Sequence, residues 1–271
     1  MIRPVLAEAA RPMRRLTAVA TAVLLSLPLL LAAGPAAAQQ SSPEAAQGPF
    51  DADEQQEIRR LVREYLLENP EVIMEAVEVL RERQQAATEQ DRQDALAANA
   101  AALRDPGILE VFGNPDGDVT IVEFFDYRCP YCRSVTEPLL EVVRADGNVR
   151  LVMKEYPILG QASTFAARAA AAAALQGKYK EFHLALMTEL QEVTQAGVLK
   201  LAERMELDAE RLQEDMQSDQ VDKLLRDTFR LAEALQIGGT PAFVVGDQFV
   251  AGAAGPERLK QLIAQARDSR Q

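Results

Sequence analysis

Two cysteines, Cys129 and Cys132, are the residues of this chain best suited to covalent chemistry, and they are its only cysteines. They follow an apolar, β-branched and aromatic run, residues 119–125, which is typical of a buried strand. After them, apolar side chains recur at helical spacing, at Val135, Leu139, Leu140 and Val143. The first turn of a helix carries unpaired N–H groups and a partial positive charge, which favours the reactive thiolate form of a sulfur held there. The pattern predicts a redox site with Cys129 as nucleophile and a more deeply buried Cys132 that closes a disulfide with it.

Other uses of the two cysteines fit the sequence less well. A structural disulfide stabilises most when it closes a long loop, and a C-x-x-C bridge closes almost none. A zinc-type site needs about four ligands, whereas the only histidine, His183, lies about fifty residues further on. We therefore expect neither a bound metal nor a cofactor, and we interpret His183 as a packing residue at the surface or in the core. A two-thiolate Cu(I) site is the alternative, because thiolates are soft ligands that suit Cu(I).

The dipeptide Thr240–Pro241, directly before a predicted strand, is a second candidate element. The cis form of an X–Pro bond costs only about 0.5–1 kcal/mol, and we predict it here in preference to an ordinary trans proline at a strand start. We expect this loop to face the C-x-x-C pair. The backbone of Thr240 can then pair with an extended client segment beside Cys129. We assign Pro130 and Tyr131, which separate the cysteines, to the same substrate contact.

Glu123 is the third candidate, because its side of the strand is expected to face inward beneath the cysteines. Burial raises the pKa of a carboxyl, and such a group can exchange a proton with the thiol of Cys132. The alternative is a partly exposed salt bridge between Glu123 and Lys154. The flanking residues Arg128 and Arg133 are expected to add positive potential near the sulfur.

The first 38 residues have the pattern of an export signal. Arginines precede an apolar stretch at residues 16–33, and residues 36–38 are three alanines that offer a cleavage site. An uncleaved anchor is the alternative, because the apolar stretch approaches the length of a bilayer crossing. Removing this segment, which carries four arginines and one glutamate, changes the formal net charge from −12 to −15. We therefore expect a periplasmic protein, and a chain this acidic is not expected to bind nucleic acid.

The residues ahead of the redox motif divide into two parts. Residues 39–50 are polar, contain proline and glycine, and predict a linker. Residues 51–104 carry two apolar helical stripes that are separated at Asn69–Pro70, and the second helix is expected to continue to about Leu103. A piece of this size cannot bury a core alone. Its stripes either pack on the following domain or, in our preferred interpretation, join copies of the chain into a homo-oligomer.

Residues 105–271 alternate between strand and helix signals. We expect, in order, an edge strand at 108–112, a strand at 119–125, a helix at 133–145, a strand at 149–154, a helical stretch at about 161–236, a hairpin at 242–250 and a helix at 256–266. A strand–helix–strand unit joined to a hairpin and a last helix predicts a thioredoxin-like fold of the α/β (α+β) class. The helical stretch is then an insertion between the two halves of that fold.

Over about residues 105–271 the sequence resembles the DsbA family of exported thiol–disulfide oxidoreductases. The resemblance depends on the E-F-F-D-Y-x-C-P-Y-C motif, on the helical insertion and on the G-G-T-P loop. It implies that Cys129 attacks, that Cys132 resolves, that Pro241 is cis and that Glu123 tunes protons. It also implies that the clients are unfolded or wrongly disulfide-bonded exported proteins, and that the redox partner is a membrane protein of the DsbB or DsbD type.

Three details refine this resemblance. The helices containing Y-L-L-E-N-P-E-V resemble those of ScsC-type proteins, some of which use them to trimerise. Tyr131 stands where DsbA itself has histidine, so the resemblance does not imply a very strong oxidant. Thr240 precedes the proline, as in disulfide isomerases of the DsbC type. We therefore expect a periplasmic oxidoreductase that forms or isomerises disulfides in exported proteins.

Overall fold

The computed structural model describes residues 49–269. The chain divides into two compact units, residues 1–68 and residues 69–271. The predicted export signal lies outside the described residues, as does nearly all of the predicted linker. No helix in the described range combines the length and the apolar character that a bilayer crossing requires.

The first unit has one described helix, α1 (Ala52–Glu68). Asp51 caps it, because the Asp51 carboxylate accepts the main-chain N–H groups of Asp53 and Glu54, each at 2.9 Å. The side chain of Glu54 accepts the N–H of Asp51 in return, which completes a capping box. No residue of this described helix is buried. Its predicted apolar stripe is between 39% and 56% exposed at Ile58, Leu61, Val62 and Tyr65.

The second unit begins with α2 (Glu71–Ala98) and α3 (Ala100–Arg104). The prediction of one continuous helix up to Leu103 is wrong. Asn99, with φ −106° and ψ 12°, ends α2 and precedes α3. The Asn99 side-chain amide donates to a main-chain carbonyl one turn earlier, at 2.8 Å, and this local bond competes with a continuous helix. Leu96 and Leu103, on either side of the break, are buried against the sheet.

The sheet of the described range has five strands: β1 (Phe112–Gly113), β2 (Val119–Phe125), β3 (Val149–Glu155), β4 (Ala242–Val245) and β5 (Gln248–Ala251). Their order is β1-β3-β2-β4-β5, with β2 and β3 parallel and the other pairs antiparallel. The predicted hairpin of β4 and β5 is confirmed. Only the last residue of the predicted edge strand 108–112 forms strand, because the chain turns before it, with the N–H of Leu109 donating to the Pro106 carbonyl at 3.1 Å.

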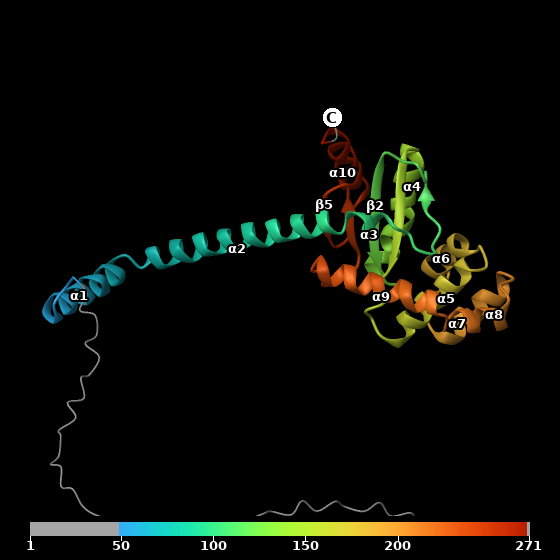
Figure 1. Ribbon diagram of the computed structural model, residues 1–271, viewed down its shortest axis with the longest axis horizontal. Helices are drawn as coiled ribbons and strands as arrows, with labels where there is room; N and C mark the ends of the chain where they lie inside the picture. Colours follow the sequence, from blue (N-terminus) through green and yellow to red (C-terminus); the bar gives the residue numbers. More distant parts are fainter. Residues whose placement is uncertain (1–48, 270–271) are drawn as a thin grey trace, which may run out of the picture. The chain divides into compact units, whose positions relative to one another are not determined.

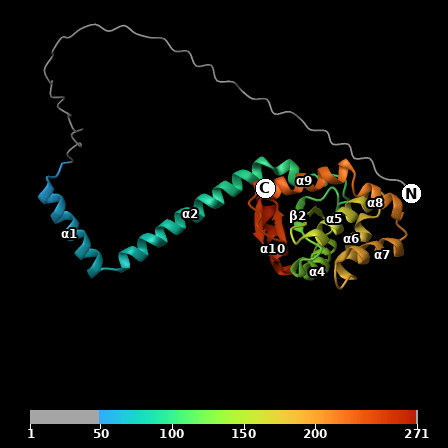
Figure 2. The same ribbon diagram turned by 90° about the horizontal axis from the view of Figure 1, so that it is seen from below.

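The remaining helices cover both faces of this sheet. They are α4 (Pro130–Asp146), α5 (Gln161–Ala174), α6 (Tyr179–Thr188), α7 (Gln195–Arg204), α8 (Ala209–Asp215), α9 (Asp219–Ala234) and α10 (Pro256–Asp268). Helices α5 to α9 form the predicted insertion between β3 and β4, and α5 to α8 gather in one group (Figure 1). Seen from below, α9 lies on one side of the strands and α4 with α10 on the other (Figure 2). The thioredoxin-like architecture is therefore confirmed.

Side chains of β2 alternate between the two faces of the sheet, and this alternation decides on which face the candidate residue Glu123 lies. Ile121 and Phe125 belong to the core that includes α4 and α10. Val122 and Phe124 belong to a second core that includes the end of α9. Glu123 therefore projects toward the α4 side, the side that carries the cysteines.

Candidate active site

The two cysteines lie at the start of α4. Strand β2 ends at Phe125, a three-residue turn follows, and Cys129 is the N-cap residue of α4 with Pro130 at the first helical position. The helix begins three residues before the predicted Arg133, so Cys132 lies within its first turn. Cys129 is thus placed at the N-terminal end of α4, where the first main-chain N–H groups have no partner within the helix.

Both cysteines are free thiols and both are buried, but to different degrees. Cys129 keeps 4% of its surface exposed and Cys132 none, as expected for a nucleophile and its partner. The pKa of the Cys132 thiol is raised by burial and, to a smaller extent, by the nearby carboxylate of Glu123. Cys132 is therefore held as a neutral thiol in this reduced form, and Cys129 is the one that solvent can reach.

The loop before β4 lies against the cysteines, as predicted. The Thr240–Pro241 peptide bond is cis. The thiol of Cys129 donates a hydrogen bond to the Thr240 carbonyl, with Sγ and the oxygen 3.2 Å apart. Tyr131, between the two cysteines, is 66% exposed, so an aromatic ring lies at the surface beside the pair. The fold thus brings the motif and the proline loop together at one place.

Glu123 is only 1% exposed, and its Oε1 has no hydrogen-bond partner within the described residues. Burial raises the pKa of this carboxyl to about 8. Glu123 therefore holds a proton at neutral pH. Because Glu123 also raises the pKa of Cys132, the two groups lie within electrostatic reach of each other. This geometry suits the exchange of a proton between them.

The alternative prediction, a salt bridge between Glu123 and Lys154, is wrong, because the two side chains lie on opposite faces of the sheet. Glu123 pairs with Met153 in the parallel register, so the next residue, Lys154, points to the other side. There its Nζ donates to the carbonyls of Ala102 at 2.9 Å and Asp105 at 2.6 Å. Burial lowers the pKa of Lys154 to about 8.

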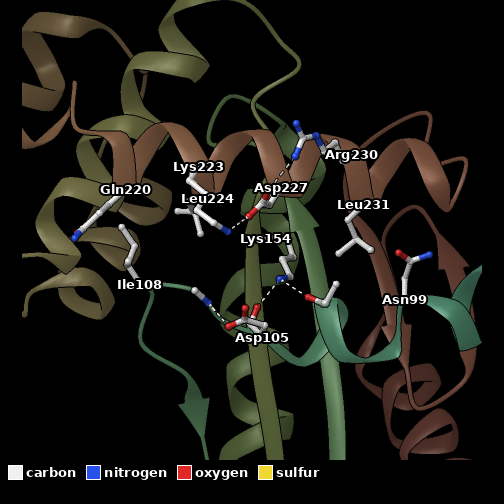
Figure 3. Close-up of a pocket in the computed structure, with 13 residues that line it drawn as sticks. Asn99, Asp105, Ile108, Lys154, Gln220, Lys223, Leu224, Asp227, Arg230 and Leu231 are labelled. Atoms are coloured by element: carbon white, nitrogen blue, oxygen red, sulfur yellow. Dashed lines mark hydrogen bonds and ion pairs between the residues drawn. The ribbon is translucent and has the colours of Figure 1, made fainter.

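Lys154 also lines a hollow of about 450 Å³ between α9 and the segment around α3 (Figure 3). Apolar side chains such as Ile108 and Leu231 line it as well. The exposed ion pair of Lys223 and Asp227, 2.5 Å apart, closes another part of its wall. The hollow includes neither cysteine and lies on the face opposite Glu123, so it is separate from the cysteine pair.

Arg128 and Arg133, which were expected to add positive potential near the sulfur, bind main-chain oxygens. Arg133 donates through Nε to the Met187 carbonyl at 3.0 Å, and through its other nitrogens to two carbonyls just beyond it. It thereby caps the C-terminal end of α6. Arg128 donates to the Leu159 carbonyl at 2.5 Å. Their direct effect is to tie α4 and the turn before it to neighbouring segments.

A buried polar cluster beside the cysteines is not evident from the sequence motifs. It consists of Tyr127, Glu155, Tyr179 and His183, each at most 1% exposed. His183 is therefore a core residue, in agreement with one of the two placements expected for it, but it also makes a polar contact with Tyr127. The available signal was the place of Tyr127 between a strand and C-x-x-C. Its partners come from distant elements, which only the fold brings together.

Comparisons with known proteins agree with this architecture. Residues 120–264 match the DSBA-like thioredoxin domain, and residues 54–87 match the copper resistance protein ScsC N-terminal domain. A solved thioredoxin-like oxidoreductase from Silicibacter pomeroyi is 47% identical, with a TM-score of 0.60, and the match covers 61% of this chain and 96% of that chain. Proteus mirabilis ScsC in a transitional conformation is 25% identical, with a TM-score of 0.59, over 81% of this chain and 100% of that chain.

Curated relatives match over a shorter share of their own length. The Na(+)/H(+) antiporter NhaA 3 of Salinispora tropica is 30% identical over 164 residues, which are 60% of this chain and 25% of that protein. The chain thus spans about a quarter of the length of the first curated relatives that it matches.

Proposed function

Because the chain belongs to the DSBA-like thioredoxin family, we propose that this thiol–disulfide oxidoreductase acts on exported proteins through Cys129 and Cys132. One observation carries the proposal: Cys129 Sγ lies at the start of α4 and 3.2 Å from the Thr240 carbonyl, next to the cis proline. An extended client segment can pair with the main chain of Thr240 while its own cysteine reaches Cys129. Pro130 and Tyr131 supply exposed surface next to that contact.

In the oxidising direction the enzyme starts with a disulfide between Cys129 and Cys132. A client thiolate attacks Cys129 Sγ, a mixed disulfide forms, and the Cys132 sulfur leaves with the electron pair of the broken S–S bond. A second client thiolate then attacks the client sulfur of the mixed disulfide, and Cys129 leaves as a thiolate. The client loses two electrons to the enzyme, and the two protons that the client thiols give up pass to enzyme groups and solvent.

Glu123 supplies the proton that Cys132 takes up as it leaves. The Glu123 carboxyl is protonated at neutral pH because burial raises its pKa to about 8. The Cys132 thiolate that forms accepts a proton readily, because burial also raises the pKa of the Cys132 thiol. Transfer from carboxyl to sulfur leaves a single negative charge in the buried site throughout. When Cys132 must attack a mixed disulfide, the same carboxylate takes the proton back.

In the isomerising direction Cys129 starts as a thiolate and attacks a client disulfide, and a client thiolate later displaces it. The threonine at position 240 and the tyrosine at position 131 favour this use over that of a very strong oxidant. Isomerisation needs a reducing partner of the DsbD type, and oxidation an oxidising partner of the DsbB type. The redox state of Cys129 in living cells, trapped with a thiol-alkylating reagent, separates the two: mostly reduced supports isomerase work and mostly oxidised supports oxidase work.

The exchange chemistry is tested with a reduced unfolded client and with a client that carries wrong disulfides. Cys129→Ser is expected to abolish turnover of both clients. Cys132→Ser is expected to accumulate a mixed disulfide with the client that carries wrong disulfides, because the Cys129 thiolate breaks a client S–S bond and no second enzyme thiol releases it; an added reductant should release it. Ser134→Ala, at an exposed position of the same helix, is the matched control and should retain wild-type rates. A Cys129→Ser variant that oxidises or reshuffles a client at the full rate would refute the proposal.

The periplasm is the proposed compartment. The arginine-containing leader with its apolar stretch and alanine cleavage site supports export, and an oxidising compartment suits a cysteine pair used for disulfide chemistry. N-terminal sequencing of the protein from a periplasmic extract should begin near Gln39. Recovery of the intact chain in the cytoplasmic fraction alone would contradict this assignment.

Self-association through the N-terminal helices is also proposed. On α1 the apolar stripe is exposed, and on α2 Ile73 and Leu80, which share one face at i and i+7 spacing, are 52% and 54% exposed. Exposed apolar stripes of this kind are expected to bury against other copies of the chain. The match of residues 54–87 to the ScsC N-terminal domain supports this interpretation.

Light scattering tests the assembly directly. The protein from residue 39 onward is expected to be oligomeric, and removal of residues 39–88 is expected to give a monomer that keeps Leu96 and Leu103 in the core. Leu61→Glu should weaken the assembly, whereas Arg63→Glu, at an exposed polar position of the same helix, should change it less. A monomeric wild-type protein would overturn this role.

A second candidate function is Cu(I) binding by the same two sulfurs. It is favoured by two observations, the free thiols of Cys129 and Cys132 in the first turn of one helix and the match to a domain described from a copper resistance protein. Metal analysis of the reduced protein purified without oxygen tests it. Stoichiometric copper that is lost in Cys129→Ser supports copper binding, and copper-free protein with full exchange activity rules it out.

A further inference from the structure

The turn that leads to the cysteines has three residues, Asp126, Tyr127 and Arg128, and each side chain is anchored elsewhere. Asp126 is 1% exposed, and its carboxylate oxygens accept the main-chain N–H groups of Arg128 at 2.8 Å and Leu159 at 2.9 Å. Arg128 donates to the carbonyl of the same Leu159. The carbonyl of Asp126 accepts the N–H of Cys129 at 3.0 Å. The position of the nucleophile therefore depends on this turn.

Tyr127 has the most deeply buried anchor of the three. Its hydroxyl donates to Oε1 of Glu155, at the end of β3, at 2.8 Å and lies 3.0 Å from Nδ1 of His183 on α6. The hydroxyl of Tyr179, also on α6, donates to the same Glu155 oxygen at 3.1 Å. Two tyrosines thus share one acceptor atom, but only Tyr127 belongs to the active-site turn.

Ring packing fixes the direction in which the Tyr127 hydroxyl points. The rings of Phe125 and Tyr127 meet edge to face with centroids 5.1 Å apart, and those of Phe125 and His183 do so at 4.9 Å. Burial lowers the pKa of His183 to about 3 and raises the pKa values of Tyr127 and Glu155 well above their ordinary range. Near pH 7 Tyr127 therefore keeps its hydroxyl proton and His183 is uncharged, so the Tyr127 hydroxyl can donate to Glu155.

We propose that Tyr127 is a positioning residue for thiol–disulfide exchange, and that its buried hydroxyl holds the turn so that Cys129 Sγ stays against the Thr240 carbonyl. The inference rests on the proposed role of Cys129 as the nucleophile. Without the hydroxyl the turn loses its link to β3 and α6, while the two bonds of Asp126 remain. The chain should therefore fold, but with a less well fixed sulfur. A misplacement of about 1 Å can slow a reaction about 100-fold, so partial loosening should slow it about tenfold.

The test compares Tyr127→Phe with Tyr179→Phe. Each change removes one hydroxyl that donates to the same oxygen of Glu155, so both should lower the urea midpoint of unfolding. The rate constant for reaction of the reduced protein with glutathione disulfide should fall about tenfold in Tyr127→Phe and less than about twofold in Tyr179→Phe. The equilibrium constant with glutathione should shift only in Tyr127→Phe, because the bond from Cys129 to Thr240 exists only in the reduced form.

Equal rate and equilibrium constants in the two variants, whether both are normal or both are reduced, overturn the positioning role. If Tyr127→Phe does not fold, His183→Phe replaces it, because that change removes the other contact of the same hydroxyl and keeps an aromatic ring. Wild-type kinetics in His183→Phe would then overturn the inference. Failure of the proposed function looks different, because wild-type protein would not exchange disulfides at all, or Cys129→Ser would exchange them normally.

Discussion

Replacing Glu123 by glutamine should change how the stability of the protein depends on pH. Burial raises the pKa of Glu123 from 4.5 to about 8. Between these two pH values the folded protein binds one proton more than the unfolded chain, so its free energy of unfolding falls as pH rises. The stability from this group is fully present below pH 4.5 and is lost as pH rises through 8. At about 1.4 kcal/mol per pH unit, the loss amounts to up to about 5 kcal/mol.

Glutamine is neutral at every pH, so position 123 no longer makes the free energy of unfolding of the variant fall as pH rises. The free energy of unfolding of Glu123→Gln relative to wild type should therefore increase steadily between pH 5 and pH 8. A constant offset from burying the amide does not alter that trend, and the difference between the two proteins cancels every other titrating group. Urea unfolding at several pH values, with a reductant present to keep both cysteines as thiols, measures it.

The matched control is Glu137→Gln, at an exposed position of α4. That side chain meets solvent in both states, so the difference curve should be nearly flat. If Glu123→Gln and wild type give parallel stability curves between pH 5 and pH 8, the carboxyl is ionised without penalty. In that case Glu123 does not hold the proton that the exchange mechanism assigns to it.

Three further substitutions test other parts of the structure. Lys154→Met leaves two main-chain carbonyls without a donor and should lower the free energy of unfolding by about 2–3 kcal/mol; an unchanged urea midpoint would count against this. Gly113→Ala should lower the free energy of unfolding by at least about 2 kcal/mol, because Gly113 has φ +72° and a Cβ there would clash with the Val149 carbonyl oxygen. Thermal unfolding measures this loss, and a variant as stable as wild type would contradict the prediction. Tyr131→Ala should raise the KM for a protein client several-fold with little change in kcat, since we propose that the exposed ring of Tyr131 contacts the client and not the reacting atoms; a lower kcat at unchanged KM would contradict this.

The parts of the fold that depend on local pattern were predictable. The strand before Cys129, the helix after Cys132 and the hairpin after Pro241 follow from apolar spacing and turn residues. The cis bond at Pro241 and the burial of Glu123 also agree with expectation. These features share one property, which is that each is encoded within a short segment.

The errors arise where distant segments decide the outcome. Which β2 residue lies beside Lys154 depends on the register of two strands, and the register sends Lys154 to the face opposite Glu123. The role of Tyr127 depends on Glu155 and His183, which follow it by 28 and 56 positions. Periodicity cannot show which polar groups will meet in a core, because that depends on how the whole insertion packs.

The opposite placement of Glu123 and Lys154 on one sheet has an electrical consequence. Both groups have a pKa of about 8, the acid raised and the amine lowered by burial. As pH rises through that value, one side of the sheet gains a negative charge and the other loses a positive one. His183, the single histidine, does not titrate near pH 8, because burial lowers its pKa to about 3. An acid–base titration of the folded protein should therefore release two extra protons near pH 8, and electrophoretic mobility should step by two charges.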